Sequence, residues 1–275
     1  MKKILALLAV ITLFTNTAFA EVDKFSKEYL EAHSGFSITR PIVESFVKRA
    51  IKKALKKETG ANFDVNFQGY TTASMKKGIF KHIEFSGKNA KINDLPVPYV
   101  SLKTLTDYNY IDYNQNPIVF KSEMTCAYEV MLSEETINAA LKEKEYQKVL
   151  SYVNKIASPI FVAKDVRIKI ANNKFYIVMD YNFPIIKMSG DKSFVMSTDF
   201  ELVNNKIISK NVHIDTSYGN LGLNKVANLI NLLNPLDFTL KQLDDDINNA
   251  RANIENINIV DNMVKVNGKI FIKGK

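Results

Sequence analysis

Apolar side chains alternate with polar ones through most of residues 166–214, and this spacing places the apolar set on one face of extended strands. The apolar positions are Val166, Ile168, Ile170, Phe175, Ile177, Met179, Tyr181, Phe194, Met196, Phe200, Leu202, Ile208, Val212 and Ile214. Asn172-Asn173 and Asn204-Asn205 interrupt the pattern, and Asn tolerates the positive φ of a tight hairpin turn. The sequence therefore predicts a four-stranded antiparallel meander with one apolar face.

Helical segments are expected on both sides of this meander. Residues 41–58 carry apolar side chains at a spacing of about 3.6 residues, and Gly60 follows as a stop signal. Ser133 suits the first cap of a second helix that breaks near Glu143 and ends near Ala157. A third helix covers residues 221–233 before Asn234-Pro235, with a short continuation toward Ala250. The apolar stripes are Ile42, Val43, Phe46, Val47, Ala50, Ile51, Ala54 and Leu55 in the first helix, and Ile137, Ala140, Leu141, Val149, Val153 and Ile156 in the second.

Shorter extended segments are expected in the rest of the chain. They cover residues 63–67, 79–92 with an interruption at Gly87, 99–105, 118–121, 123–132, and a final hairpin of 254–259 and 264–272. Leu95-Pro96-Val97-Pro98 is expected to form a rigid connection, and Asp261-Asn262 the last turn. No glycine-rich or proline-rich linker divides the chain. We therefore expect an α+β fold, with one elongated domain over residues 41–275 after an N-terminal extension of residues 21–40.

The first 20 residues have the parts of an export signal in the right order. Lys2-Lys3 form a charged start, residues 4–14 a mostly apolar stretch, and Ala18-Phe19-Ala20 a small-x-small cleavage pattern. An uncleaved membrane anchor is the alternative, but the apolar run is shorter than the roughly 20 residues that a spanning helix needs. We expect cleavage near Ala20 and a location in the periplasm or another extracytoplasmic part of the envelope.

The composition fits a globular protein without disulfides. Hydrophobic residues make up 46% of the chain and charged residues 24%, which argues against a disordered chain. Cys126 is the only cysteine, so no internal disulfide can form, and its apolar neighbours favour a buried thiol over a nucleophile. Removal of Lys2 and Lys3 with the signal lowers the net charge from +8 to +6, so the mature protein is mildly basic.

No motif of catalysis or of metal binding is present. HExxH, paired CxxC, GxSxG and GxxxxGK[ST] are absent, and His33, His82 and His213 lack recognisable partners in the sequence. The consecutive acids of residues 244–246 lack the alternating spacing of a calcium loop and suit a solvated helix face. We therefore expect no enzyme, cofactor or metal site. Because separate carboxylates can meet in space, as in glycosidases, an envelope hydrolase is kept as the weakest alternative.

Cations crowd one side of the predicted helix at residues 41–58. They are Lys48, Arg49, Lys52, Lys53, Lys56 and Lys57. Such a face can lie on an anionic membrane, or it can simply be solvated while the apolar stripe packs into the core, and both can hold at once. No nucleic-acid-binding module accompanies these cations, so nucleic acid is not an expected partner.

Several short segments resemble the LmeA-like phospholipid-binding proteins of bacterial envelopes, which have tubular lipid-binding (TULIP-like) folds. They are Leu55–Val65 (LKKETGANFDV), Lys77–Ile83 (KGIFKHI), Leu132–Leu141 (LSEETINAAL), Asn228–Pro235 (NLINLLNP) and the closing hairpin within Ile257–Ile270. The resemblance extends from residue 40 to the end of the chain, and none of its segments is a catalytic signature.

The resemblance implies a highly curved antiparallel sheet wrapped around a long helix, with an apolar tunnel for acyl chains. The tunnel candidates are then Ile137, Leu141, Ile168, Phe175, Ile177, Met179, Tyr181, Phe194, Met196 and Phe200. Adaptable side chains such as Met131, Met179, Met188 and Met196 suit acyl chains, although Met in a strand more often belongs to a plain core. The expected function is lipid transport or envelope maintenance by a monomer that binds phospholipid or another acyl lipid. A non-catalytic structural or interaction protein with a packed core is the alternative.

Overall fold

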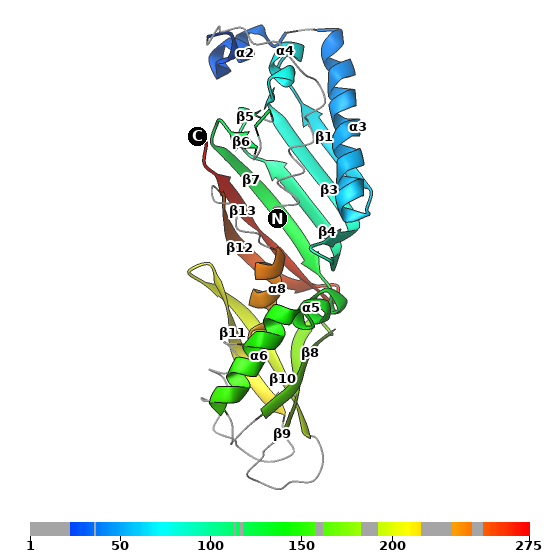
Figure 1. Cartoon of the computed structure of the whole chain (residues 1–275), viewed down its shortest axis with the longest axis vertical. Helices are drawn as coiled ribbons and strands as arrows, with labels where there is room; N and C mark the ends of the chain where they lie inside the picture. The colour runs from blue at the N-terminus through cyan, green and yellow to red at the C-terminus, as the bar shows by residue number, and fades with distance from the viewer. Residues whose placement is uncertain are drawn as a thin grey trace. The chain divides into compact units, whose positions relative to one another are not determined.

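The computed structural model describes residues 23–35, 37–112, 114–115, 118–157, 162–182, 192–215, 233–243 and 250–275. These residues form an α+β fold with few helices and mostly antiparallel sheets of six, four and three strands (Figure 1). The predicted α+β class is confirmed. Outside the described residues lie the predicted signal of residues 1–20, most of the predicted helix at 221–233, the acidic cluster at 244–246, Met188, and the side chains of Ile156 and Ile214.

The chain divides into two compact units. The first comprises Met1–Val130, Asp244–Asn253 and Asn267–Lys275, and the second comprises Met131–Leu243 and Ile254–Val266. Strands β7 (Met124–Leu132), β12 (Ala250–Val260) and β13 (Met263–Ile272) carry the chain from one unit to the other. That residues 41–275 behave as one domain stays a prediction.

The strands β1, β3 and β4 of the first unit belong to a six-stranded sheet in the order β1-β3-β4-β7-β13-β12. It begins with β1 (Phe63–Gln68), β3 (His82–Ile92) and β4 (Leu95–Thr104). Asn93 and Asp94, both at positive φ, form the turn between β3 and β4. The prediction of a rigid connection at residues 95–98 is wrong, because these residues begin β4 and Pro96 pairs with Lys91. Proline is compatible with a strand near its first residues, where a missing N–H interrupts little of the ladder.

Strand β3 continues through Gly87, where the sequence predicts an interruption. Phe63 of β1 lies opposite Gly87, and a Cβ added to Gly87 would come within 2.6 Å of the Phe63 ring. The glycine is therefore explained by the close approach of an aromatic ring. The interruption within residues 79–92 lies instead at Lys81, which separates β2 (Ile79–Phe80) from β3. The short strand β2 pairs with β5 (Asn109–Asp112), which pairs with β6 (Val119–Phe120) in the three-stranded sheet.

Helix α3 (Thr39–Thr59) packs against β1 and β3 (Figure 1). Gly60 ends it in the left-handed conformation, with φ of 72°, and donates its N–H to the Lys56 carbonyl at 2.9 Å. The buried members of the predicted stripe are Val47, Ile51, Ala54 and Leu55. Ile42 and Phe46 are 54% and 50% exposed, so the alternative in which the whole apolar stripe packs into the core is wrong for these two residues. The eight apolar positions span a wider arc than the side of the helix that the sheet covers.

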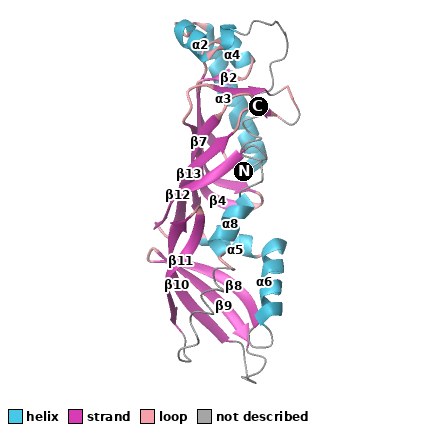
Figure 2. Cartoon of the chain, turned by 90° about the vertical axis from the view of Figure 1, so that its left-hand side faces the viewer, coloured by secondary structure: helices cyan, strands magenta, loops and turns pink. Residues whose placement is uncertain are grey.

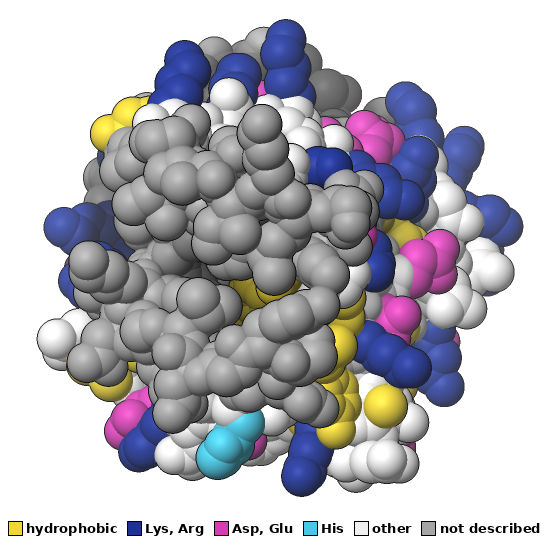
Figure 3. All heavy atoms as spheres, turned by 90° about the horizontal axis from the view of Figure 1, so that it is seen from below, with side chains coloured by type: hydrophobic (Ala, Val, Ile, Leu, Met, Phe, Trp, Pro, Cys, Tyr) yellow, Lys and Arg dark blue, Asp and Glu magenta, His cyan; other side chains and the backbone are white. Residues whose placement is uncertain are grey.

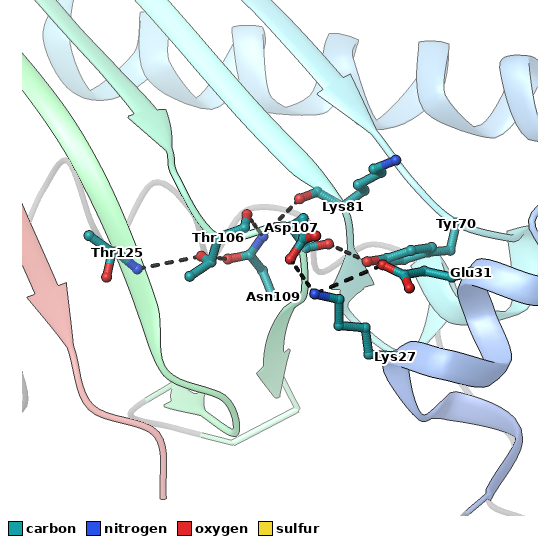
Figure 4. A network of polar contacts seen from close by, with 8 residues as sticks. All are labelled: Lys27, Glu31, Tyr70, Lys81, Thr106, Asp107, Asn109 and Thr125. Carbon is teal, nitrogen blue, oxygen red and sulfur yellow. Dashed lines mark hydrogen bonds and ion pairs between the residues drawn. The ribbon is translucent and has the colours of Figure 1, made fainter.

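The segment predicted to be an N-terminal extension contributes to the first unit. It forms a 3₁₀ turn, η2 (Asp23–Phe25), and helix α2 (Lys27–His33), and helix α4 (Thr72–Lys76) follows after β1. Leu30 is 1% exposed and packs with Tyr70 and Ile79. Lys27 Nζ lies 2.8 Å from Asp107 Oδ1, and the Tyr70 hydroxyl donates to the Asp107 carbonyl (Figure 4). Apolar and polar contacts together fix α2 to the loop before β5.

The second unit contains the predicted meander, a four-stranded sheet in the order β11-β10-β9-β8. Its strands are β8 (Val162–Ala171), β9 (Lys174–Asn182), β10 (Lys192–Val203) and β11 (Lys206–Asp215), with antiparallel pairing throughout. The Asn pairs at 172–173 and 204–205 form the turns, with φ between 51° and 62°. The meander and its hairpins are therefore confirmed. The last hairpin also turns at Asp261-Asn262, both at positive φ, as predicted.

Helices α5 (Glu134–Leu141), α6 (Lys144–Ala157) and α8 (Pro235–Leu243) complete the second unit (Figure 2). Ser133 Oγ accepts the Thr136 N–H at 3.1 Å and Thr136 Oγ1 accepts the Ser133 N–H, so the predicted cap is confirmed as a capping box. The predicted break separates α5 from α6.

Helix α8 begins at the Asn-Pro pair that the sequence predicts to end an earlier helix. Asn234 Oδ1 accepts the Leu236 N–H at 3.1 Å, and Pro235 occupies the first helical position, which needs no N–H donor. The described part of this helix reaches Leu243, and Ala250 belongs to β12, so the predicted helical continuation does not extend to Ala250.

Candidate functional site

The ten residues predicted to line an acyl tunnel lie together in the second unit. Helix α5 contributes Ile137 and Leu141, β8 contributes Ile168, β9 contributes Phe175, Ile177, Met179 and Tyr181, and β10 contributes Phe194, Met196 and Phe200. Nine of them are at most 6% exposed, and Phe200 is partly buried. The structure thus gathers the predicted set on α5 and one face of β8–β10. We call this set the apolar surface.

Cross-strand pairing arranges these side chains in rows. Ile177 lies opposite Ile168 on β8 and opposite Met196 on β10. In the next row Met179 lies opposite Phe194. Directly paired residues point to the same face of a sheet, so the rows form a continuous surface across three strands.

Aromatic rings occupy both ends of β9 on the apolar surface. The ring centroids of Phe175 and Phe200 are 4.8 Å apart at 76°, and those of Tyr181 and Phe194 are 5.4 Å apart at 51°. Such ring pairs are typical of tightly packed cores. At its two ends, the apolar surface is therefore packed on itself.

Side chains of α5 and α6 bond the outer backbone groups of β8, the last strand in the sheet order. Asn138 accepts the Ile168 N–H at 2.7 Å and donates to the Ile168 carbonyl at 2.9 Å. Asn154 accepts the Ala163 N–H at 2.8 Å and donates to its carbonyl at 2.7 Å. A bulge between Ala163 and Asp165 lets Ala163 and Ile168 present their backbone groups to the same side. The two Asn side chains thus replace part of a fifth strand.

Strand β11 extends the apolar surface through residues that the sequence analysis missed. Ile207 is 4% exposed, whereas Ile208, predicted to face inward, is 36% exposed. The two-residue turn pairs Leu202 with Ile207, and paired residues occupy the same face of the sheet. Pairing the two strands outward from this turn in the sequence would therefore have placed Ile207, and not Ile208, on the apolar face. Ser209 lies opposite Phe200, and its buried Oγ has no hydrogen-bond partner in the described part of the chain.

Tyr146 on α6 is a second buried residue missed from the sequence. It is 1% exposed, its hydroxyl donates to the Leu233 carbonyl at 3.2 Å, and its ring centroid lies 5.1 Å from that of Phe238 on α8. Burial raises the pKa of Tyr146 above its ordinary value. The overlooked signal is the spacing of Tyr146, Leu150 and Val153, which places all three on one side of α6.

The six cations predicted to contact a membrane lie on α3, in the unit that does not hold the apolar surface. Arg49, Lys52, Lys53, Lys56 and Lys57 are exposed, and Lys48 is partly buried. Lys52 Nζ lies 3.7 Å from Asp64 Oδ1, and no carboxylate among the described residues forms an ion pair with the other five. Basic side chains also lie around the outline of the face shown in Figure 3, so positive charge is not confined to α3.

One cluster in the first unit has the residue types of a hydrolase site. His82 Nδ1 lies 2.9 Å from Thr104 Oγ1, and His82 Nε2 lies 3.9 Å from Glu84 Oε2. Thr104 is only 2% exposed, and its hydroxyl accepts the Ile83 N–H at 3.0 Å. A nucleophile needs an open approach to its substrate. The burial and backbone bond of Thr104 instead give the cluster a role in joining β3 to β4.

The free energy of unfolding should depend on His82 at mildly acidic pH. Burial, together with the charge of Lys103, lowers the pKa of His82 below its ordinary value of 6.5. The unfolded chain then binds a proton more readily than the folded protein, so stability should fall as pH drops below 6.5 and level off below the lowered pKa. In urea unfolding at about pH 7.5 and about pH 5, His82→Gln should show a smaller pH dependence than the unchanged protein. The exposed His213→Gln is the control, and equal pH dependence in all three proteins would contradict the expectation.

Cys126, predicted to be buried, is 0% exposed, and burial raises the pKa of its thiol to about 12. The described residues contain no group of three or more His, Cys, Asp or Glu that could hold a metal ion. Within the same part of the chain, no helix is long and apolar enough to cross a membrane. In comparisons with known proteins, the chain matches no family model, no curated protein and no solved structure.

Proposed function

We propose that the protein is an exported, non-catalytic lipid-binding protein of the cell envelope, which takes phospholipid acyl chains into an apolar tunnel. In this proposal the antiparallel sheet is strongly curved and wraps around a long helix, as in TULIP-like folds, and the cations of α3 contact an anionic membrane. The observation that supports the proposal most is the continuous apolar surface, to which two strand rows and α5 contribute large side chains.

Acyl chains match the chemistry of this surface. Transfer of one methylene from water to an apolar environment is favourable by about 0.8 kcal/mol, so a chain of a dozen or so methylenes gains on the order of 10 kcal/mol before the cost of ordering it. Met179 and Met196 lie in the two central rows, and their unbranched side chains adapt to ligands of different shape. The Ser209 hydroxyl can donate to an ester carbonyl near the margin of the surface.

A structural or interaction protein with a packed core is the second candidate. Two observations favour this candidate: nine of the ten tunnel candidates are almost completely buried, and two pairs of aromatic rings pack against each other. In that case the three helices α5, α6 and α8 fill the space over the inner face of the sheet, and the protein acts through its exterior.

The protein purified from cells that export it should contain co-purifying phospholipid, released by organic extraction and identified by mass spectrometry. The delipidated protein should take up a fluorescent phospholipid. Because a ligand that binds only the folded state stabilises it, free short-chain phospholipid at about 100 times its dissociation constant should add about 2.7 kcal/mol to the free energy of unfolding. Absence of extracted lipid, of uptake and of stabilisation would contradict the proposal.

A further inference from the structure

Three large apolar side chains follow one line along the outward side of α3. Ile38 is 75% exposed, Ile42 54% and Phe46 50%. Ile38 precedes the helix but has helical dihedral angles, φ −66° and ψ −33°, so the spacing of four residues keeps the three side chains on one side. The opposite side of α3 faces the sheet through Val47 and Ile51. We call the three exposed residues the apolar ridge.

Cations continue the same line toward the end of the helix. Arg49 follows Phe46 by three residues, Lys53 follows Arg49 by four, and Lys56 follows Lys53 by three, which keeps them on the side of the apolar ridge. All three cations are exposed, and none forms an ion pair with a described carboxylate. At about 1.5 Å per residue, the ridge covers about 12 Å of the helix axis and the cations the next 15 Å or so.

We propose that this side of α3 inserts into the surface of a bilayer that contains anionic phospholipid. Ile38, Ile42 and Phe46 enter the boundary between head groups and acyl chains, and Arg49, Lys53 and Lys56 bind the phosphates of neighbouring head groups. The apolar face of an interfacial helix lies about 5–10 Å deep in this boundary. The exposed side chains of the apolar ridge can reach this depth. The helix therefore lies obliquely, with its first turns deepest.

Charge complementarity selects an anionic bilayer over a protein partner. The ridge is convex and its continuation carries only positive charge, whereas a protein partner would need a groove of matching length with acidic residues at one end. Lipid rearranges around a convex ridge and supplies phosphate at every position along it. This inference deepens the proposed function, because it assigns the depth and orientation of α3, and it does not require the tunnel.

Vesicle flotation with the purified protein tests the insertion. The vesicles contain phosphatidylcholine alone or with about a third phosphatidylglycerol, and the variant replaces Ile38, Ile42 and Phe46 by Gln, a good helix former. We expect binding to the anionic vesicles to weaken on the order of 100-fold, with unchanged circular dichroism. Replacement of Leu105, Val260 and Phe271 by Gln is the matched control, since these side chains are 49%, 41% and 44% exposed and do not belong to α3. Equal vesicle binding by the ridge variant and the control would overturn the proposal.

A second variant separates the contribution of the cations to vesicle binding from that of the inserted apolar side chains. Replacement of Arg49, Lys53 and Lys56 by Gln should weaken binding to anionic vesicles by about 100-fold and leave binding to neutral vesicles unchanged. Undiminished anionic binding would overturn the role of these cations. A protein that dimerises through the ridge, detected as a halved mass in light scattering of the ridge variant, would also overturn the proposal.

A fluorescent label reports the depth directly. In Phe46→Cys, a thiol-reactive environment-sensitive dye should label residue 46 alone, because Cys126 is buried. Its emission should shift to the blue with anionic vesicles, whereas the same dye on Glu58→Cys should shift less, and equal shifts would contradict an oblique helix. Uptake of short-chain phospholipid monomers by the ridge variant distinguishes the two proposals. In the ridge variant, retained uptake with lost vesicle binding supports both proposals. In the unchanged protein, vesicle binding without uptake leaves insertion standing while the tunnel fails.

Discussion

An Ile177→Trp variant should remain folded and lose most of its lipid if the apolar surface lines an acyl tunnel. Ile177 occupies the row between Ile168 and Met196, so an indole ring there projects into the middle of the surface. In a tunnel the ring takes the place of lipid, and we expect the lipid content to fall about tenfold, equivalent to about 1.4 kcal/mol of binding. The free energy of unfolding should then change by less than about 1 kcal/mol, because the ring fills existing space.

The packed-core alternative gives the opposite pattern for the same variant. A filled core has no room for the larger ring, so the variant should lose about 1–3 kcal/mol of stability whatever its lipid content. Val178→Trp is the matched control, because Val178 is only partly buried and points to the other face of β9, where it pairs with the exposed Val195. Urea unfolding and lipid quantification on the three proteins decide between the alternatives. Equal lipid content in both Trp variants would exclude Ile177 from the tunnel.

Local patterns in the sequence are sufficient for the meander and for placing the tunnel candidates of β9 on one face of it. Strand periodicity assigns alternate residues from Phe175 to Tyr181 to one face, and Asn pairs mark the turns at the strand ends. The error at Ile208 shows the limit of periodicity without register, because a shift by one residue exchanges the two faces of a strand. The turn at Asn204-Asn205 contains the missing information.

Long-range contacts account for most of what the sequence did not predict. The bonds of Asn138 with Ile168 join residues 30 apart, and the bond from Tyr146 to Leu233 joins residues 87 apart. No local pattern states which helix covers which strand. The exposure of Phe46 also depends on long-range contacts. An apolar stripe indicates which residues of a helix can be buried, and the area that the neighbouring sheet covers determines which of them are buried.

Loss of the two Asn side chains that bond β8 should destabilise the second unit more than any single surface change. In Asn138→Ala with Asn154→Ala, the backbone N–H and carbonyl groups of Ile168 and Ala163 lose their partners. Each unsatisfied buried group costs about 1–3 kcal/mol, and because both sites are only partly buried we expect a total loss of about 4 kcal/mol. Urea unfolding followed by circular dichroism measures this loss. Lys148→Ala, an exposed change on α6, is the control and should stay within about 0.5 kcal/mol.

The same double variant should also self-associate. Without the Asn side chains, β8 presents unpaired backbone groups along the edge of a sheet, and such an edge is a template for pairing with a second chain. Light scattering should therefore show dimers or larger species for the double variant and none for Lys148→Ala. Helix α5 packs on β8 and contributes Ile137 and Leu141 to the apolar surface, so its release should also lower the lipid content of the purified variant. A monomeric variant of unchanged stability would show that packing of the helices alone protects this edge.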